Sequence, residues 1–282
     1  MGEFTGKRVV ITGGALGIGF ATAEIFVKAG ARVAILEIEE SYAQGTLSRL
    51  GGEAADVLFL PCDVSDALAV EKNLAVLMER FSGIDILVNV AGWELNKPFL
   101  DTTWDEYRAV MDENVGGAFL VSREVARLMI GSIPADNTSM CEAHRRGAEA
   151  QAQPPVMVRK SGGVIINVAG ALCRGGHEGY ALYQASKAAL IALTRSMAAE
   201  LLPYGIRVNS VSPGFVLSPG LRVGLRGTGN EEKALREFKE KQPLKRYGMT
   251  QEIARTIMAA CGGDFAFAWG SDILVDGGYT LA

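Results

Sequence analysis

Residues 7–37 read KRVVITGGALGIGFATAEIFVKAGARVAILE, and this stretch decides the fold of the chain. The β-branched run at 7–12 predicts a buried strand, and the apolar spacing at 20–29 predicts a helix that ends at Gly30. Residues 32–37 predict a second strand. A strand, a glycine-rich turn, a helix and a strand within about thirty residues are typical of a dinucleotide-binding unit.

The turn between the first strand and its helix is rich in glycine. Glycine lets the backbone bend sharply and approach a pyrophosphate, and the start of the helix offers N–H groups and a positive dipole. A purely structural turn is the alternative, but the flanking strand and helix favour dinucleotide binding. The residues of this turn that we expect to bind the cofactor are Thr12, Gly13, Leu16, Gly17, Ile18 and Gly19.

Glu37 closes the second predicted strand, where an acidic side chain can accept hydrogen bonds from both ribose hydroxyls of an adenosine. The same carboxylate would repel a 2′-phosphate, and no Arg or Lys follows within residues 38–44. We therefore expect NAD(H) rather than NADP(H) as the cofactor. The alternative is that Glu37 is only a solvated charge at the end of a strand.

The alternation of strands and helices continues to the end of the chain. Further strands are predicted at 57–62, 84–90, 163–168, 206–212 and 272–275, and helices at 41–50, 66–81, 104–129, 179–202, 231–241 and 250–260. Strands that alternate with helices favour an α/β fold, with a parallel sheet covered on both faces. Because no change of composition divides the chain, we expect one domain over residues 1–282.

The composition limits the partners and the compartment. Apolar residues make up 49% and charged residues 21%, and the net charge of −4 gives no reason to expect nucleic acid or a membrane surface. No apolar run approaches the ~18 residues that span a bilayer, and residues 1–8 lack the order of a signal peptide. The four cysteines show neither metal-ligand spacing nor a disulfide framework, so we expect a cytoplasmic protein without a metal.

Tyr183 and Lys187 are candidates for proton transfer. They lie four residues apart in a run with helical spacing, so their side chains share one face. A phenol with a pKa near ~10 is a poor acid or base at neutral pH, but a neighbouring ammonium lowers that pKa. The pair could then move a proton on or off a substrate oxygen. The same spacing also occurs by chance, so the rest of the chain must decide.

These motifs, in this order, resemble those of the short-chain dehydrogenase/reductase family over nearly the whole chain. The glycine turn matches the family's cofactor turn, Asn114 its catalytic asparagine, and Tyr183 and Lys187 its catalytic pair. The resemblance implies a Rossmann-like doubly wound parallel sheet of about seven strands. It extends the expected cofactor contacts to Asp63, Val64, Asn89, Ala91, Gly92, Tyr183, Lys187, Pro213, Gly214, Val216 and Ser218.

The resemblance also implies roles for these residues. Tyr183 would be the general acid or base, Lys187 would hold the nicotinamide ribose and lower the pKa of Tyr183, and Asn114 would hold a water in a proton relay. Hydride transfer itself belongs to the nicotinamide. The implied enzyme is an NAD(H)-dependent oxidoreductase for an alcohol/ketone pair, and such enzymes are commonly homodimers or homotetramers.

One catalytic residue of the family is missing. Its serine normally stands thirteen residues before the tyrosine, where this chain has Gly170. Losing one preorganised donor commonly costs about 10²–10³ in rate. His177 is a candidate substitute, because a neutral imidazole could hydrogen-bond a substrate oxygen, although a solvent-facing loop histidine is the alternative. Cys173 is a weaker candidate, because a thiol is a poor donor.

Two segments and a small set of residues are expected to shape the substrate side. Residues 131–160 exceed the family's usual spacing, and we expect an oligomer contact or a surface flap rather than a substrate lid. Residues 214–245 would form a movable flap over the substrate. Mostly apolar or aromatic candidates predict a largely apolar small molecule. The tentative substrate contacts are Gly170, Trp93, Glu94, His177 and Tyr180, of which Glu94 could bind a hydroxyl or amine or point to water.

Two other functions stay open. Tyr180 lies seven residues before Lys187, a spacing that resembles the enoyl-reductase branch of the family, which also lacks the serine. That branch usually has a different glycine turn. The missing serine also leaves a weakly active or non-catalytic NAD-binding protein as an alternative. The intact Asn114, Tyr183 and Lys187 favour the alcohol/ketone oxidoreductase.

Overall fold

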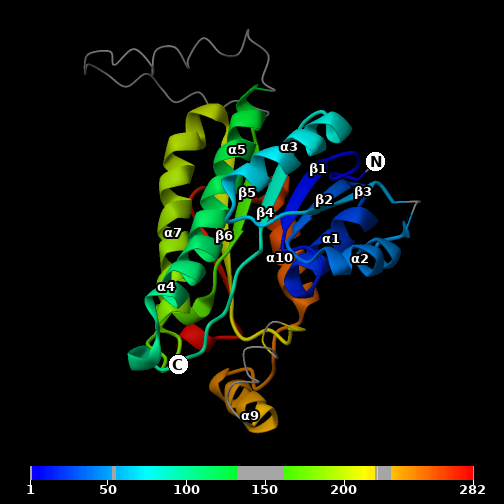
Figure 1. Cartoon of the computed structure of the whole chain (residues 1–282). Coiled ribbons are helices and arrows are strands. Elements are labelled where there is room, and N and C mark those ends of the chain that lie inside the picture. Colours follow the sequence, from blue (N-terminus) through cyan, green and yellow to red (C-terminus); the bar gives the residue numbers. More distant parts are fainter. Residues whose placement is uncertain (1, 53–54, 132–161, 220, 222–229, 282) are drawn as a thin grey trace.

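A seven-stranded parallel sheet forms the centre of the computed structural model, which describes residues 2–52, 55–131, 162–219, 221 and 230–281 (Figure 1). The strand order is β3-β2-β1-β4-β5-β6-β7, so the direction of winding reverses between β1 and β4. This order confirms the predicted doubly wound α/β fold. The strands are β1 (Arg8–Thr12), β2 (Arg32–Glu37), β3 (Val57–Pro61), β4 (Ile86–Asn89), β5 (Gly163–Val168), β6 (Ile206–Pro213) and β7 (Asp272–Val275).

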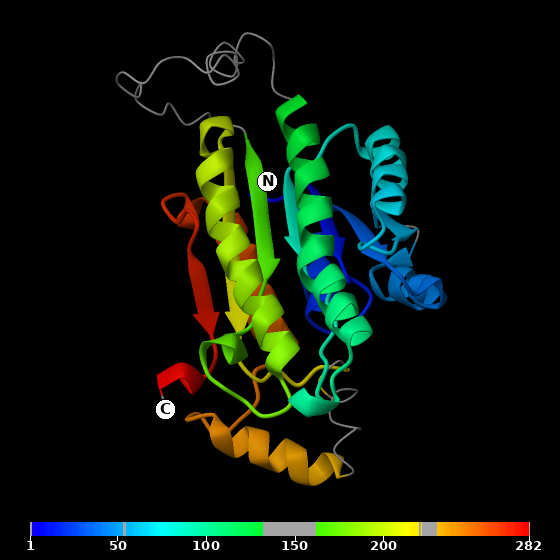
Figure 2. The ribbon, with the colours of Figure 1, turned by 60° about the vertical axis from the view of Figure 1, so that its left-hand side comes forward.

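Helices cover both faces of this sheet. Apolar side chains of α3, α5 and α7 pack on one face, and those of α1 and α10 pack on the other. Figure 2 shows α5 and α7 in front of the sheet, and α9 at the end toward which the strands point. The helices are α1 (Gly17–Lys28), α2 (Ala43–Arg49), α3 (Ala67–Phe81), α4 (Trp104–Met111), α5 (Ala118–Gly131), α7 (Ala181–Leu201), α9 (Glu231–Lys241) and α10 (Thr250–Cys261).

Burial on both faces explains why the strands are continuous apolar runs. In β1, Val9, Val10 and Ile11 are all 0% exposed. Val9 and Ile11 contribute to the core beneath α1 and α10, whereas Val10 belongs to the core beneath α3, α5 and α7. Burying each such side chain stabilises the fold by about 1.5–3 kcal/mol relative to leaving it exposed.

The helix predicted at 104–129 contains an interruption. α4 and α5 are joined by a π-helical segment, Asp112–Gly117, which carries Asn114. A Cβ on Gly117 would lie 2.6 Å from Cγ2 of Val64, so glycine permits this segment to approach the turn after β3. Single π-helical turns inside α-helices are frequent at functional sites, and period counting along the sequence does not detect them.

The two predicted special segments are only partly described by the structure. The insertion predicted at 131–160 lies outside the described residues apart from Gly131. α5 ends at Gly131 and β5 begins at Gly163, so the insertion joins the sheet at the amino end of β5. In the segment predicted as a flap, Val216 forms a β-bridge with Gly248. Within the described ranges, no helix is long and apolar enough to cross a bilayer.

A buried polar network ties the centre of the sheet to α5 and α7. Asn89 Nδ2 donates to Ser122 Oγ and to Asn167 Oδ1, at 2.8 Å each. Asn167 Nδ2 in turn donates to Thr194 Oγ1 at 2.9 Å. All four residues are buried, so each lost bond leaves a polar atom without water. The network therefore holds both long helices against β4 and β5.

Replacing Asn167 tests this network. Asn167→Leu is expected to lower the free energy of unfolding by about 2 kcal/mol, because the amide of Asn89 and the hydroxyl of Thr194 lose a partner. Urea unfolding followed by circular dichroism measures the change. The matched control is Gln251→Leu, at an exposed amide in α10, and should change the free energy by less than ~0.5 kcal/mol. Equal effects of the two substitutions would contradict a structural role for the network.

Candidate active site

A cavity of about 670 Å³ opens at the carboxyl ends of β1 to β6. Its position, beside the point where the strand order reverses, is where doubly wound folds bind ligands. Most of the predicted cofactor and substrate residues line it. These are Gly13, Leu16, Gly17, Ile18, Glu37, Asp63, Val64, Ala91, Gly92, Trp93, Glu94, Gly170, Tyr183, Lys187, Pro213, Gly214, Val216 and Ser218.

The glycine turn is compressed in a way that only glycine permits. A Cβ on Gly19 would lie 2.0 Å from the carbonyl oxygen of Gly13. A Cβ on Gly13, whose φ is +65°, would lie 2.9 Å from the backbone of Ala91. α1 then begins at Gly17 without a side-chain cap. Its first N–H groups therefore face the cavity with capacity to bind a pyrophosphate, so the turn fits a dinucleotide.

Six of the predicted site residues do not line the cavity, and two of these, Asn114 and His177, are described below. Thr12 Oγ1 accepts hydrogen bonds from the N–H groups of Val90 and Ala91, at 3.1 Å each, and so joins the turn after β1 to the turn after β4. Gly19 supports the turn by its closeness to Gly13. Asn89 belongs to the buried network already described. Tyr180 packs beneath the site and is 3% exposed.

Glu37 and Asp63 lie at the part of the cavity formed by β2 and β3. Glu37 Oε2 accepts from the N–H of Ala15 at 3.3 Å, and Oε1 accepts from the N–H of Ile38 at 3.1 Å. These bonds aim the carboxylate at the end of β2 and leave lone pairs for a ligand. Asp63 Oδ1 accepts from both the N–H and the hydroxyl of Ser65, at 2.8 and 2.7 Å, which fixes the turn after β3.

Asn114 clamps the loop that follows β4. Its Oδ1 accepts from the N–H of Trp93 at 2.6 Å, and its Nδ2 donates to the carbonyl of Trp93 at 3.0 Å and to Ser186 Oγ at 2.9 Å. A Cβ on Gly92 would lie 2.8 Å from Asn114 Oδ1 and 3.2 Å from Lys187 Nζ. The absence of a side chain at Gly92 therefore lets the Asn114 amide and the Lys187 ammonium both approach the backbone after β4.

Lys187 and Tyr183 come from α7 and line the same cavity as the glycine turn. Lys187 is buried, and its Nζ donates to the carbonyl of Val168 at 3.1 Å. The same Nζ lies 5.7 Å from the centroid of the Tyr183 ring. Burial lowers the pKa of Lys187 to about 8, although Glu113 and Glu94 oppose this shift. Lys187 therefore carries its charge at neutral pH.

The pKa of Tyr183 moves opposite to the expected direction in the structure without ligands. Burial of the phenol raises it, and the negative charge of Glu94 adds to the rise. Tyr183 is consequently a neutral phenol at pH 7, with a proton to donate. The ring is still partly exposed to the cavity, so its hydroxyl can reach a bound molecule.

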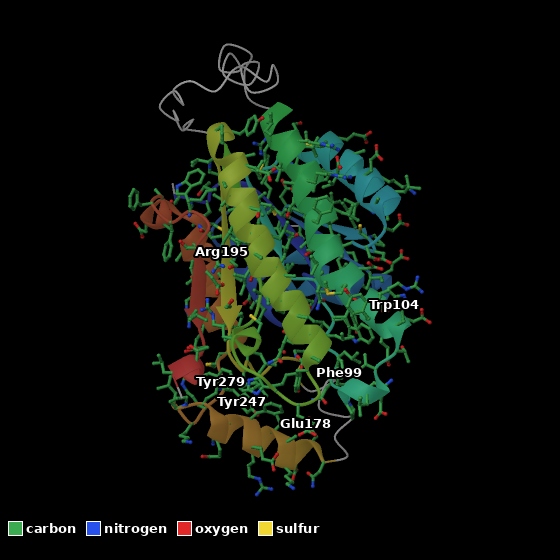
Figure 3. All side chains as sticks on the ribbon, turned by 90° about the vertical axis from the view of Figure 1, so that its left-hand side faces the viewer. Phe99, Trp104, Glu178, Arg195, Tyr247 and Tyr279 are labelled. Atoms are coloured by element: carbon green, nitrogen blue, oxygen red, sulfur yellow. The ribbon has the colours of Figure 1, made fainter. Side chains whose placement is uncertain are left out.

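His177 lies behind the cavity, in contact with Tyr279. The Tyr279 hydroxyl is within hydrogen-bond reach of the imidazole, 3.3 Å from Nδ1 and closer still to Nε2, and the two ring centroids are 5.5 Å apart. Tyr279 lines the cavity and His177 does not. Figure 3 shows Tyr279 at the end of the molecule where α9 lies, as expected for the substrate side.

Sequence reasoning missed Tyr279 and Glu113, both of which line the cavity. The signal for Tyr279 is its place directly after the Asp276-Gly277-Gly278 turn, whose Asp276 accepts from the N–H of Thr280 at 2.9 Å. Glu113 precedes Asn114 in the π-helical segment, and only that adjacency could have indicated it. Among the described residues, no cluster of His, Cys, Asp and Glu could hold a metal ion.

Comparisons with known proteins agree with the fold. The family model described as short chain dehydrogenase matches residues 7–136, and the model described as enoyl-(acyl carrier protein) reductase matches residues 146–280. An uncharacterized oxidoreductase of Thermotoga maritima is 35% identical over 99% of each chain. The NADPH carbonyl reductase 2 of Sus scrofa is 32% identical, again over 99% of each chain. The solved structure of levodione reductase superposes with a TM-score of 0.85 at 28% identity, covering 99% of each chain.

The doubly wound sheet and the tyrosine–lysine pair beside a glycine turn define an oxidoreductase that uses a nicotinamide dinucleotide. With relatives at this identity along its whole length, the chain belongs to the short-chain dehydrogenase/reductase family.

The compressed turn provides a test of the dinucleotide site. Gly19→Ala is expected to abolish saturable NADH binding, or to lower the free energy of unfolding by more than ~2 kcal/mol, because its Cβ would overlap the carbonyl of Gly13. NADH fluorescence titration and urea unfolding measure the two effects. Gly45→Ala is the control, since nothing lies within 4 Å of a Cβ at that position in α2. If Gly19→Ala behaved like this control, the turn would not be the constrained element described here.

Proposed function

We propose that this protein is an NAD(H)-dependent oxidoreductase that transfers a hydride between the nicotinamide and an alcohol/ketone pair on a largely apolar small molecule. The observation that carries the proposal is the meeting of Tyr183, Lys187 and the glycine turn on one cavity. A non-catalytic dinucleotide-binding protein would not need a buried lysine beside a neutral phenol, since both groups carry a desolvation cost.

The residues of the chain have separate roles in this reaction. When bound, the nicotinamide supplies the hydride in reduction and accepts it in oxidation. In reduction, the neutral phenol of Tyr183 donates its proton to the substrate oxygen, and the nearby charge of Lys187 stabilises the phenolate that remains. Asn114 holds the loop after β4, and hence the wall of the cavity, in place during this transfer.

The lining at the substrate side supports an apolar substrate. Aromatic and aliphatic side chains from four separate segments form this part of the wall, and they are Trp93, Leu172, Phe215, Leu221 and Tyr279. Such a surface binds by excluding water and leaves orientation to a few polar groups.

A homodimer or homotetramer also stays a prediction, as does the cytoplasmic compartment.

The tyrosine carries the first test of this function. Tyr183→Phe is expected to lower kcat for ketone reduction by about 10²–10³-fold, because the proton donor is lost, while NADH affinity stays within a few-fold. NADH oxidation with a panel of ketones and enones measures this. Tyr107→Phe, on α4 and stacked on Trp104, is the control.

The same panel separates the alternatives. Turnover of enones but not ketones would support enoyl reduction, the reading to which the second family description points. The burial of the Tyr180 hydroxyl, away from the cavity, favours Tyr183 as the catalytic tyrosine instead. NADH binding without turnover of either class would support a non-catalytic protein.

The carboxylate at the end of β2 supports NAD(H) as the cofactor, whereas the Sus scrofa relative is named for NADPH. The wild type is expected to show a higher kcat/KM with NADH than with NADPH. Glu37→Arg should shift this ratio toward NADPH by about 10²-fold, since it replaces a repulsive charge with an attractive one. Glu39→Arg, at an exposed position outside the cavity, is the control. A wild type that prefers NADPH would contradict this assignment.

A further inference from the structure

An unfilled space lies beside the hydroxyl of Tyr183. A Cβ on Gly170 would be 3.5 Å from Tyr183 Oη and 3.9 Å from Lys187 Cγ, which are ordinary contact distances. The backbone of Gly170 is extended, with φ −179° and ψ 135°, a conformation that any residue adopts. The structure therefore has room for a serine at this position. The absence of the serine removes a hydrogen-bond donor, and packing does not require that absence.

Few polar side chains remain to replace that donor. Among the described residues at the substrate side of the cavity, Tyr183, Lys187, Glu94 and Tyr279 carry titratable groups. Lys187 Nζ already donates to the carbonyl of Val168. The Tyr279 hydroxyl is engaged by His177. Glu94 follows Trp93, whose N–H and carbonyl are both held by Asn114, so its place on the wall is defined by the backbone.

The surroundings of Glu94 favour its acid form. The carboxyl group interacts with the charge of Lys187 and with the hydroxyl of Tyr180, and its own charge acts on Tyr183. Burial raises the pKa of Glu94 to about 7, and this effect outweighs the opposing charge of Lys187. A carboxyl group with a pKa near 7 is about half in its acid form at neutral pH, and that form can donate a hydrogen bond to a substrate oxygen.

Tyr180 lies beneath Glu94 with an unsatisfied hydroxyl. This oxygen is fully buried and makes no hydrogen bond of regular geometry, although it is close enough to the carboxyl of Glu94 to lower the pKa of that group. The hydroxyl of Tyr180 is therefore the buried polar group beside the carboxyl of Glu94 that can orient it.

We propose that Glu94 replaces the missing serine, with its carboxyl group donating a hydrogen bond to the reacting oxygen of the substrate and Tyr180 positioning that group. In reduction, the hydride adds to the carbonyl carbon and Tyr183 gives its proton to the oxygen. Glu94 keeps its own proton and stabilises the charge that develops before the transfer. This inference rests on the proposed alcohol/ketone function.

The first experiment compares Glu94→Ala with the double variant Glu94→Ala/Gly170→Ser, using a ketone that the wild type reduces. Glu94→Ala should lower kcat by about 10²–10³-fold, and adding the serine should recover at least ~10-fold, because its hydroxyl would stand beside Tyr183. NADH titration shows that each variant is folded. Glu178→Gln, an exposed carboxylate in the loop before Tyr180, is the control and should behave as the wild type (Figure 3).

The second experiment uses pH. Glu94 donates only below its pKa, so kcat/KM for reduction should fall as the pH rises through about 7. Glu94→Gln keeps a donor but cannot ionise, so this fall should vanish and leave only the later loss near pH 8 from Lys187. Tyr180→Phe should move the first fall to higher pH, because the hydroxyl that lowers the pKa of Glu94 is gone.

The outcomes separate this inference from the function on which it rests. If the wild type reduces no ketone, the proposed function fails. If the wild type is active and Glu94→Ala keeps its kcat, or raises KM alone, Glu94 is a binding group for another part of the substrate and the inference is overturned. A loss in Glu94→Ala that Gly170→Ser does not relieve, or an unchanged pH profile in Glu94→Gln, overturns it equally.

Discussion

The close contact between Gly19 and the carbonyl oxygen of Gly13 is the constraint on which the rest of the structure depends. With a Cβ only 2.0 Å from that oxygen, no other residue could occupy position 19 without opening the turn. The tight turn lets α1 begin directly beneath the end of β1, and lets Gly13 approach the backbone of Ala91. β1 and β4 stay paired up to Thr12 and Asn89, at the point where the sheet reverses, and the cavity opens where the segments that follow these strands leave the sheet.

Much of this arrangement could be predicted because it depends on patterns of residue types within short stretches of the sequence. Continuous β-branched runs identify β1 and β2, since a strand buried on both faces needs apolar side chains at every position. The spacing of Tyr183 and Lys187 needs only a helix to bring them to one face. The family resemblance then supplied residues, such as Asp63 and Ser218, whose spatial neighbours lie far away in the sequence.

What could not be predicted depends on contacts between distant segments. The pairing of His177 with Tyr279 joins residues that are 102 positions apart, and nothing near His177 in the sequence indicates it. Thr12, predicted as a cofactor contact, accepts from two amides of the turn after β4, and these partners lie 78 and 79 positions away in the sequence. The π-helical segment around Asn114 is likewise invisible to a count of helical periods. In each case the missing information is tertiary.

Burial favours the uncharged form of three ionisable groups of the site. It raises the pKa values of Tyr183 and Glu94 and lowers that of Lys187, because a low-dielectric cavity disfavours every charged form. Opposite charges nearby only partly offset this, so Tyr183 is neutral, Glu94 changes its protonation near pH 7, and Lys187 keeps a charge that is lost near pH 8. A serine would be the less costly donor in such a place, since it carries no charge to desolvate. A carboxyl group in place of the serine donates a hydrogen bond only when it is protonated. Hydrogen-bond donation to the substrate oxygen beside Gly170 therefore depends on pH.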